Sequence, residues 1–132
     1  MAVISEIKSG NYFEVMHDGG RKKCVISRVL DNPYYIVSLA DGNRMVVRNT
    51  ELLPIAITEG WLQQLGYSPG EIAEHWIHTS GNSSVLQYHN ADKSAVLIDA
   101  AAQLKQAPCS YIHQLQNAYC DLHGSQLLEP GG

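Results

Sequence analysis

Histidine and cysteine pairs at metal-ligand spacing are the first chemistry that this sequence offers. Three pairs and one further histidine are candidates: His75-x-x-His78, Cys109-x-x-x-His113, Cys120-x-x-His123 and His89. A zinc site needs three or four such ligands converging at about 2.0–2.3 Å. Residues 75 and 78 of a strand would point to opposite faces, whereas Cys120 and His123 could converge on a helix. Isolated, half-buried side chains are the simpler interpretation, so we predict neither a metal nor another cofactor.

Catalytic groupings are equally weak. Cys120, His113 and Asp121 could be arranged as nucleophile, base and orienting group, but no nucleophile elbow or paired carboxylates accompany them. The stretch 18–23 (DGGRKK) is similar to a phosphate loop only superficially, because it lies between two predicted strands and opens no helix. We therefore predict that the protein is not an enzyme. A metal-dependent hydrolase is the weakest of the alternatives.

Side chains suited to binding a ligand are better represented. Arginines could pair with phosphate and an aromatic ring could hold a base, while neutral amide and imidazole groups provide directional hydrogen bonds. On this basis the predicted ligand-binding residues are Arg44, Arg48, Trp76, His78, His113 and Asn117. The alternative for the tryptophan is burial in a core, which is where tryptophan is more often found.

Charge is unevenly distributed along the 132 residues, whose formal net charge is −4. Residues 1–57 hold seven basic and six acidic side chains, and residues 58–132 hold two and seven. The overall charge argues against general binding to nucleic acid or anionic membranes. A local basic patch can still form from Arg21, Lys22, Lys23, Arg28, Arg44 and Arg48. Three irregularly spaced cysteines, no apolar run near 18 residues and no leader sequence indicate a cytoplasmic protein.

The elements that would position these side chains suggest an α+β protein with two lobes, 1–57 and 58–132. The first lobe is predicted to contain short strands at 11–17, 24–30, 34–39, 44–48 and 55–57, with a helical turn at 49–54. Strands at this spacing favour a small closed barrel, because closure removes exposed edges. The hairpin ending in Glu51-Leu52-Leu53-Pro54 resembles a Src-homology-3-like or Tudor-like barrel over residues 7–57. This resemblance implies a fold rather than a function.

The second lobe is predicted to combine helices with a three- or four-stranded antiparallel sheet. The expected elements are a short helix at 58–66, a helical turn at 69–74, strands at 75–79, 85–89 and 95–99, and a C-terminal helix at 111–123. Ser110 and Gly124 suit the two ends of that last helix. Its apolar arc is expected to comprise Tyr111, Ile112, Leu115, Ala118, Tyr119 and Leu122. The polar run beside the arc (HQLQN, 113–117) predicts hydrogen bonds to the backbone of the barrel or a buried contact with a partner subunit or ligand.

Three segments resemble an uncharacterised family of small proteins from gut bacteria, their phages and mobile elements. They are IKSGNYF (7–13), PIAITEGWLQQLGY (54–67) and YIHQLQNAYCDLHG (111–124), with departures from the family pattern at Cys120, Asp121 and His123. The resemblance implies a phage or mobile-element setting rather than a mechanism. Together with the lack of a catalytic grouping and a surface low in charge, it predicts an oligomeric, non-catalytic binding protein in the host cytoplasm. It would antagonise host defence by sequestering a nucleotide signal or by blocking a defence protein. The alternative is an accessory protein that binds nucleic acid through the barrel.

Overall fold

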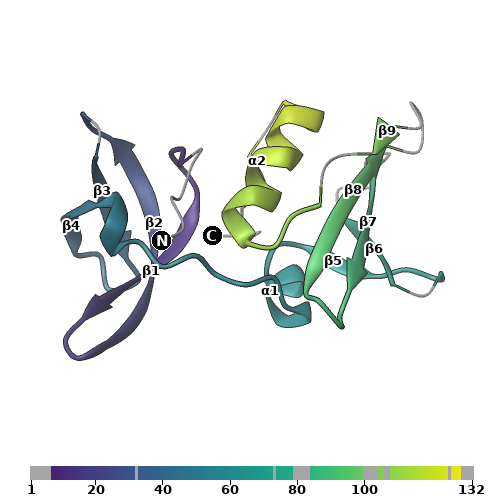
Figure 1. Cartoon of the computed structure of the whole chain (residues 1–132), viewed down its shortest axis with the longest axis horizontal. Helices are drawn as coiled ribbons and strands as arrows, with labels where there is room; N and C mark the ends of the chain where they lie inside the picture. The colour runs from purple at the N-terminus through teal and green to yellow at the C-terminus, as the bar shows by residue number, and fades with distance from the viewer. Residues whose placement is uncertain are drawn as a thin grey trace. The chain divides into compact units, whose positions relative to one another are not determined.

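A computed structural model describes residues 7–31, 33–72, 74–78, 84–99, 104–105, 108–124 and 126–128 (Figure 1). The chain divides into two compact units, Met1–Ile55 and Ala56–Gly132, which we call the N-terminal and C-terminal units. Each contains an antiparallel sheet, and the second also contains the longest helix, so the predicted α+β class is confirmed. Among the described residues, no helix has the length and apolar character needed to cross a membrane.

The N-terminal unit is a four-stranded meander in the order β1-β2-β3-β4. Its elements are β1 (Tyr12–His17), β2 (Gly20–Val29), β3 (Tyr34–Leu39), β4 (Arg44–Arg48) and the 3₁₀ turn η1 (Asn49–Glu51). The first and last hairpins, β1–β2 and β3–β4, were predicted from their turn residues. Gly19 and Gly42 have φ values of +79° and +91°, a backbone region that glycine adopts without steric cost.

The return of the chain after η1 differs from the sequence prediction. Leu53 exchanges two backbone hydrogen bonds with Glu14 of β1, at 2.9 and 2.8 Å, but this contact is an isolated bridge. A strand over 55–57 was predicted and is wrong, because Pro54 has no N–H to extend a ladder and Ala56 bridges to Tyr111 instead. The closed barrel is not confirmed.

One face of this sheet forms the core of the N-terminal unit. Side chains that alternate along the strands are buried together: Phe13, Val15, Cys24, Ile26, Val37, Leu39 and Val47, joined by Leu52. The period of two places the intervening residues on the opposite, outer face. That outer face carries Arg28, Arg44 and Arg48 and is the starting point for the candidate site.

The C-terminal unit consists of a five-stranded sheet and two helices. Its elements are α1 (Glu59–Gln64), β5 (Tyr67–Pro69), β6 (His75–His78), β7 (Ser84–His89), β8 (Ser94–Asp99), β9 (Leu104–Lys105) and α2 (Ile112–His123), with the strands in sequential order. The helical turn predicted at 69–74 is wrong. Residues 67–69 instead pair with residues 76–78, and the Gly70 N–H donates to the His75 carbonyl at 2.7 Å.

Helix α2 begins one residue later than the sequence predicts. Tyr111 is the N-cap, and the Gln114 side-chain oxygen accepts hydrogen bonds from the backbone N–H groups of Ser110 and Tyr111, at 2.9 and 3.2 Å. Gly124 ends the helix in the left-handed conformation, as predicted. The buried face is broader than the predicted apolar arc: Ile112, His113, Leu115, Gln116, Asn117 and Tyr119 are buried, whereas Tyr111 is exposed.

Candidate functional site

The six residues predicted to bind a ligand lie on three elements in both units. Arg44 and Arg48 are exposed on β4 of the N-terminal unit. In the C-terminal unit, β6 carries Trp76 and His78, and α2 carries His113 and Asn117. Trp76, His113 and Asn117 are between 3% and 6% exposed, so they are packed inside the fold rather than presented to a ligand. The two arginines therefore become the centre of the candidate site.

Three arginines share the outer face of the N-terminal sheet. Arg44 and Arg48 are four positions apart on β4. Because the side chains of a strand alternate with a period of two, they lie on the same side. Arg28 reaches this face because the pairing of β2 with β3 slips between Ile26 and Arg28, leaving Ser27 as the extra residue of a bulge. Without the bulge, the period of two would turn Arg28 to the core side, as it does Ile26.

An aromatic and an apolar side chain share this face with the three arginines. We call the whole surface the basic face, and it consists of Arg28, Tyr34, Arg44, Val46 and Arg48. Tyr34 lies opposite Arg48 in the ladder, and the Arg48 guanidinium carbon is 5.8 Å from the centre of the Tyr34 ring. Val46 is 61% exposed. An open groove of about 530 Å³ is lined by Arg28, Val29, Leu30, Asp31, Tyr34 and Val46. The basic face thus presents cations beside an aromatic ring and an apolar surface.

The electrostatics of the basic face favour an anion. None of the three guanidinium groups forms an ion pair with a carboxylate in the part of the chain that the structure describes. By contrast, Arg21 near the β1–β2 turn is paired with Glu14 at 2.9 Å. Guanidinium groups without internal partners can donate two parallel hydrogen bonds to a phosphate or carboxylate.

His78 packs among aromatic rings of the C-terminal unit. His78 packs edge-on against Tyr67, at 5.0 Å between ring centres, and lies 5.5 Å from Tyr119, which in turn lies 4.5 Å from His123. His78 Nε2 lies 3.1 Å from the Leu65 carbonyl oxygen. Burial lowers the pKa of His78, and the nearby His123 lowers it further, whereas the bond to Leu65 opposes the shift. His78 is therefore held as a neutral packing residue.

The polar residues of α2 are also tied into their own unit. Gln116 Nε2 donates to the Leu127 carbonyl at 2.9 Å and fixes the segment that follows the helix. His113 is 3% exposed, and its ring stacks with that of Tyr111 at 6.1 Å. The described hydrogen bonds of Gln114 and Gln116 lie within the C-terminal unit, whereas bonds to the backbone of the barrel were predicted.

Comparison of the chain with protein-family models, curated proteins and solved structures finds no match. What the protein does must therefore be inferred from its own residues. Within the residues that the structure describes, the basic face combines cations that lack carboxylate partners with an exposed aromatic ring and an adjoining groove.

The cysteine and histidine pairs do not converge. The described residues contain no group of three or more histidine, cysteine or acidic side chains able to hold a metal ion. Burial raises the pKa of Cys109 to about 11, and that of Cys24 likewise to about 11, so both thiols are protonated at neutral pH. A protonated, buried thiol is a poor ligand and a poor nucleophile.

Sequence reasoning missed two members of the basic face, Tyr34 and Val46. The signal for Tyr34 was present, because a hairpin turning at Asp41-Gly42 sets Tyr34 opposite Arg48. No comparable signal marks the bulge at Ser27, whose hydroxyl donates to the Ile36 carbonyl at 3.1 Å. Arg28 was recognised only as part of a general basic patch.

Proposed function

We propose that the protein is a non-catalytic binding protein whose basic face takes a phosphate-bearing ligand, a nucleotide. The observation that carries this proposal is the placement of Arg28, Arg44 and Arg48 on one face of the sheet, without carboxylate partners among the described residues, with Arg48 beside Tyr34. Guanidinium groups bind phosphate oxygens, and the phenol ring offers a surface on which a base stacks. The groove of about 530 Å³ is large enough for such a ligand.

The biological setting of the proposal comes from the resemblance of three segments to small phage and mobile-element proteins. Such a protein, acting as a homo-oligomer in the host cytoplasm, would antagonise host defence by sequestering a nucleotide signal or by blocking a defence protein. We also propose that the N-terminal unit is related to SH3-like barrels. The four-strand meander, the turn η1 and the return of Leu53 to β1 support this relationship.

Nucleotide binding can be tested by thermal shift with linear and cyclic mono- and dinucleotides. A ligand that binds the folded state raises the apparent stability by RT ln(1 + [L]/Kd). Replacing Arg44 or Arg48 by alanine should weaken the binding of an active nucleotide about tenfold each, since each removes a charge-assisted contact worth about 1.5 kcal/mol. Tyr34→Phe should preserve affinity and Tyr34→Ala should reduce it.

The matched control is Lys22→Ala, which removes an exposed cation that lies outside the basic face. This variant should bind like the wild-type protein. If no nucleotide shifts the melting temperature at millimolar concentration, nucleotide binding is wrong. Equal losses for Lys22→Ala and Arg48→Ala would show that only the overall charge matters, which would also overturn the proposed site.

A nucleic-acid-binding accessory protein is the second candidate, because the cations of the basic face lie on β2 and β4, on either side of β3. The excess of acidic residues after position 57 opposes it. For a 15-nucleotide single strand, the affinity should fall steeply with salt, and each lost phosphate contact should reduce the slope by about 0.7. Binding of this strand that mononucleotides cannot displace would favour the second candidate over the first.

A further inference from the structure

A groove on the C-terminal unit has a chemical character opposite to that of the basic face. It lies at the β5–β6 hairpin, has a volume of about 470 Å³, and its apolar lining is Pro69, Ile72, Ile77 and Val85. Ile72 is 64% exposed and Ile77 is 43% exposed. Large aliphatic side chains gathered at an exposed groove indicate a surface that another molecule covers.

The backbone of the hairpin is tight enough to fix this groove. A Cβ atom on Gly70 would lie 3.2 Å from the His75 carbonyl oxygen and 3.4 Å from Ile77 Cδ1, so the glycine lets the hairpin close. Glu74, at φ +67°, makes the turn that leads into β6. Its carbonyl accepts a hydrogen bond from the Tyr88 N–H at 2.8 Å, which ties the turn to β7.

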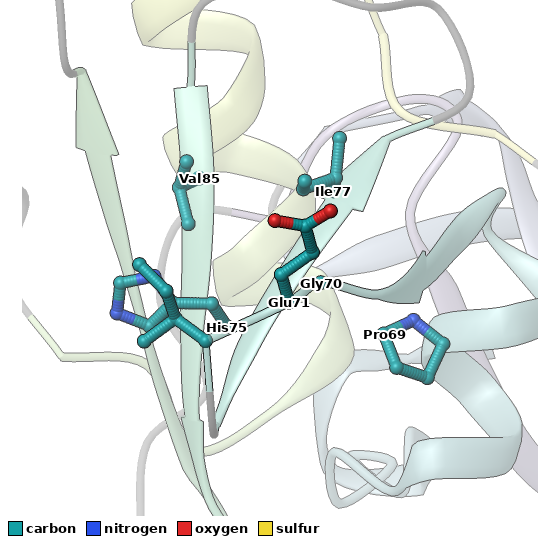
Figure 2. Close-up of a pocket in the computed structure, with 7 residues that line it drawn as sticks. Pro69, Gly70, Glu71, His75, Ile77 and Val85 are labelled. Carbon is teal, nitrogen blue, oxygen red and sulfur yellow. The ribbon is translucent and has the colours of Figure 1, made fainter.

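One acidic side chain lines the groove, and two more line a pocket that adjoins it. Figure 2 shows the Glu71 side chain extending along the groove between the labelled side chains of Ile77 and Val85. An adjoining pocket of about 320 Å³ shares Pro69, Gly70, Ile72 and His75 with the groove and adds Glu59 and Glu74 to its lining.

The positive groups near the groove are few. Among the residues that the structure describes, no lysine or arginine lines either pocket. His75 is the imidazole that lines both, and His89 lies 3.2 Å from Glu74 through its Nδ1 atom. Glu59 and Glu71 therefore supply the negative charge that is left to interact with a partner.

From this combination we infer a docking site for an extended peptide segment of a partner protein that carries lysine or arginine between aliphatic side chains. The aliphatic groups would cover Ile72 and Ile77, and the cations would pair with Glu59 and Glu71. The groove at the β5–β6 hairpin, which we call the hairpin groove, belongs to a different unit from the basic face and has the opposite charge. This site therefore does not depend on nucleotide binding. Its partner would be a protein surface.

The test uses the full chain and the labelled peptide acetyl-Leu-Lys-Val-Arg-Leu-amide in fluorescence anisotropy. Saturable binding is expected, at least tenfold tighter than to Leu-Gln-Val-Gln-Leu or Ser-Lys-Ser-Arg-Ser with the same end groups. Ile72→Ser should weaken binding about tenfold, because it removes a large part of the apolar contact. Glu71→Gln should weaken it about threefold, the effect of one partly screened ion pair.

Two control variants make the same chemical changes elsewhere. Asp121→Asn removes an exposed carboxylate from α2, and Met16→Ser removes an exposed apolar side chain from β1. Both should bind the peptide like the wild-type protein, and circular dichroism checks that all four variants remain folded. The inference is overturned if the peptide does not saturate at millimolar concentration, or if the variants in the groove and the controls behave alike. Concentration-dependent dimers in sedimentation, lost in Ile72→Ser and not dissociated by the peptide, would identify a second copy as the occupant instead.

Discussion

Lowering the pH from 6.5 to 4 is expected to cost the folded protein about 3 kcal/mol through His113 alone. Burial lowers the pKa of His113 from 6.5 to about 4. In the unfolded chain the imidazole binds a proton as the pH falls below 6.5, whereas in the folded chain it stays neutral until about pH 4. Since the unfolded state binds more protons throughout this window, stability falls as the pH falls. Each unit of pKa difference corresponds to about 1.4 kcal/mol.

Urea unfolding at pH 6.5, 5.2 and 4.0 measures this loss, and the His113→Gln variant isolates it. The variant keeps a side-chain N–H donor but has no titratable group, so its stability should change less over the same window. His78→Gln should also flatten the profile, because burial lowers the pKa of His78. Parallel profiles for the wild-type protein and His113→Gln would contradict the prediction. The chemical shift of the His113 ring protons gives its pKa directly.

The N-terminal sheet shows how much of the fold can be predicted from local sequence signals. Tyr34–Leu39 and Arg44–Arg48 were predicted with their observed bounds, because Asp41-Gly42 determines the hairpin locally and Asp41 accepts a hydrogen bond from the Asn43 N–H at 2.9 Å. The predicted strand sets Arg44 and Arg48 four positions apart, which corresponds to one face of the sheet, although they were named only as members of a patch. Local signals could not place Arg28 beside them, because the bulge at Ser27 depends on how two strands fit over their shared core.

The hairpin groove illustrates the opposite case. Ser68-Pro69-Gly70-Glu71 carries good helix-start signals, and a helical turn was predicted from them. In the structure, Ser68 pairs with Ile77, and long-range pairing overrides the local preference. The wrong element also concealed the candidate docking site, since a helix at 69–74 would not bring Glu71 into one groove with Ile77 and Val85.

The C-terminal helix falls between these cases. Its ends could be predicted to within one residue from Gly124 and the polar residues at its start. Its buried polar groups could not be assigned, because the partner of Gln116 is the carbonyl of Leu127, beyond the end of the helix. Periodicity identifies which side of a helix is apolar, but it does not predict that the core also accepts His113 and Asn117.

Removing a hydroxyl group from two buried tyrosines of the C-terminal unit should change stability in opposite directions. The Tyr67 hydroxyl is buried and has no hydrogen-bond partner among the described residues, and burial together with the neighbouring Tyr119 raises its pKa. The Tyr88 hydroxyl is also buried, but it donates to the Ile57 carbonyl at 2.9 Å. Tyr67→Phe removes an unsatisfied group and should stabilise the protein by about 1–2 kcal/mol.

Tyr88→Phe is the matched control, because it deletes the same atom from a residue that is 3% exposed, against 2% for Tyr67. It takes away the hydrogen bond to the Ile57 carbonyl and should cost about 1–3 kcal/mol. Urea unfolding at pH 7 compares the two variants with the wild-type protein under identical conditions. Equal destabilisation by both substitutions would mean that the Tyr67 hydroxyl has a partner, such as a bound water molecule, in solution. The sign of the Tyr67→Phe effect therefore reports whether the Tyr67 hydroxyl, whose ring packs against His78, is dry in solution.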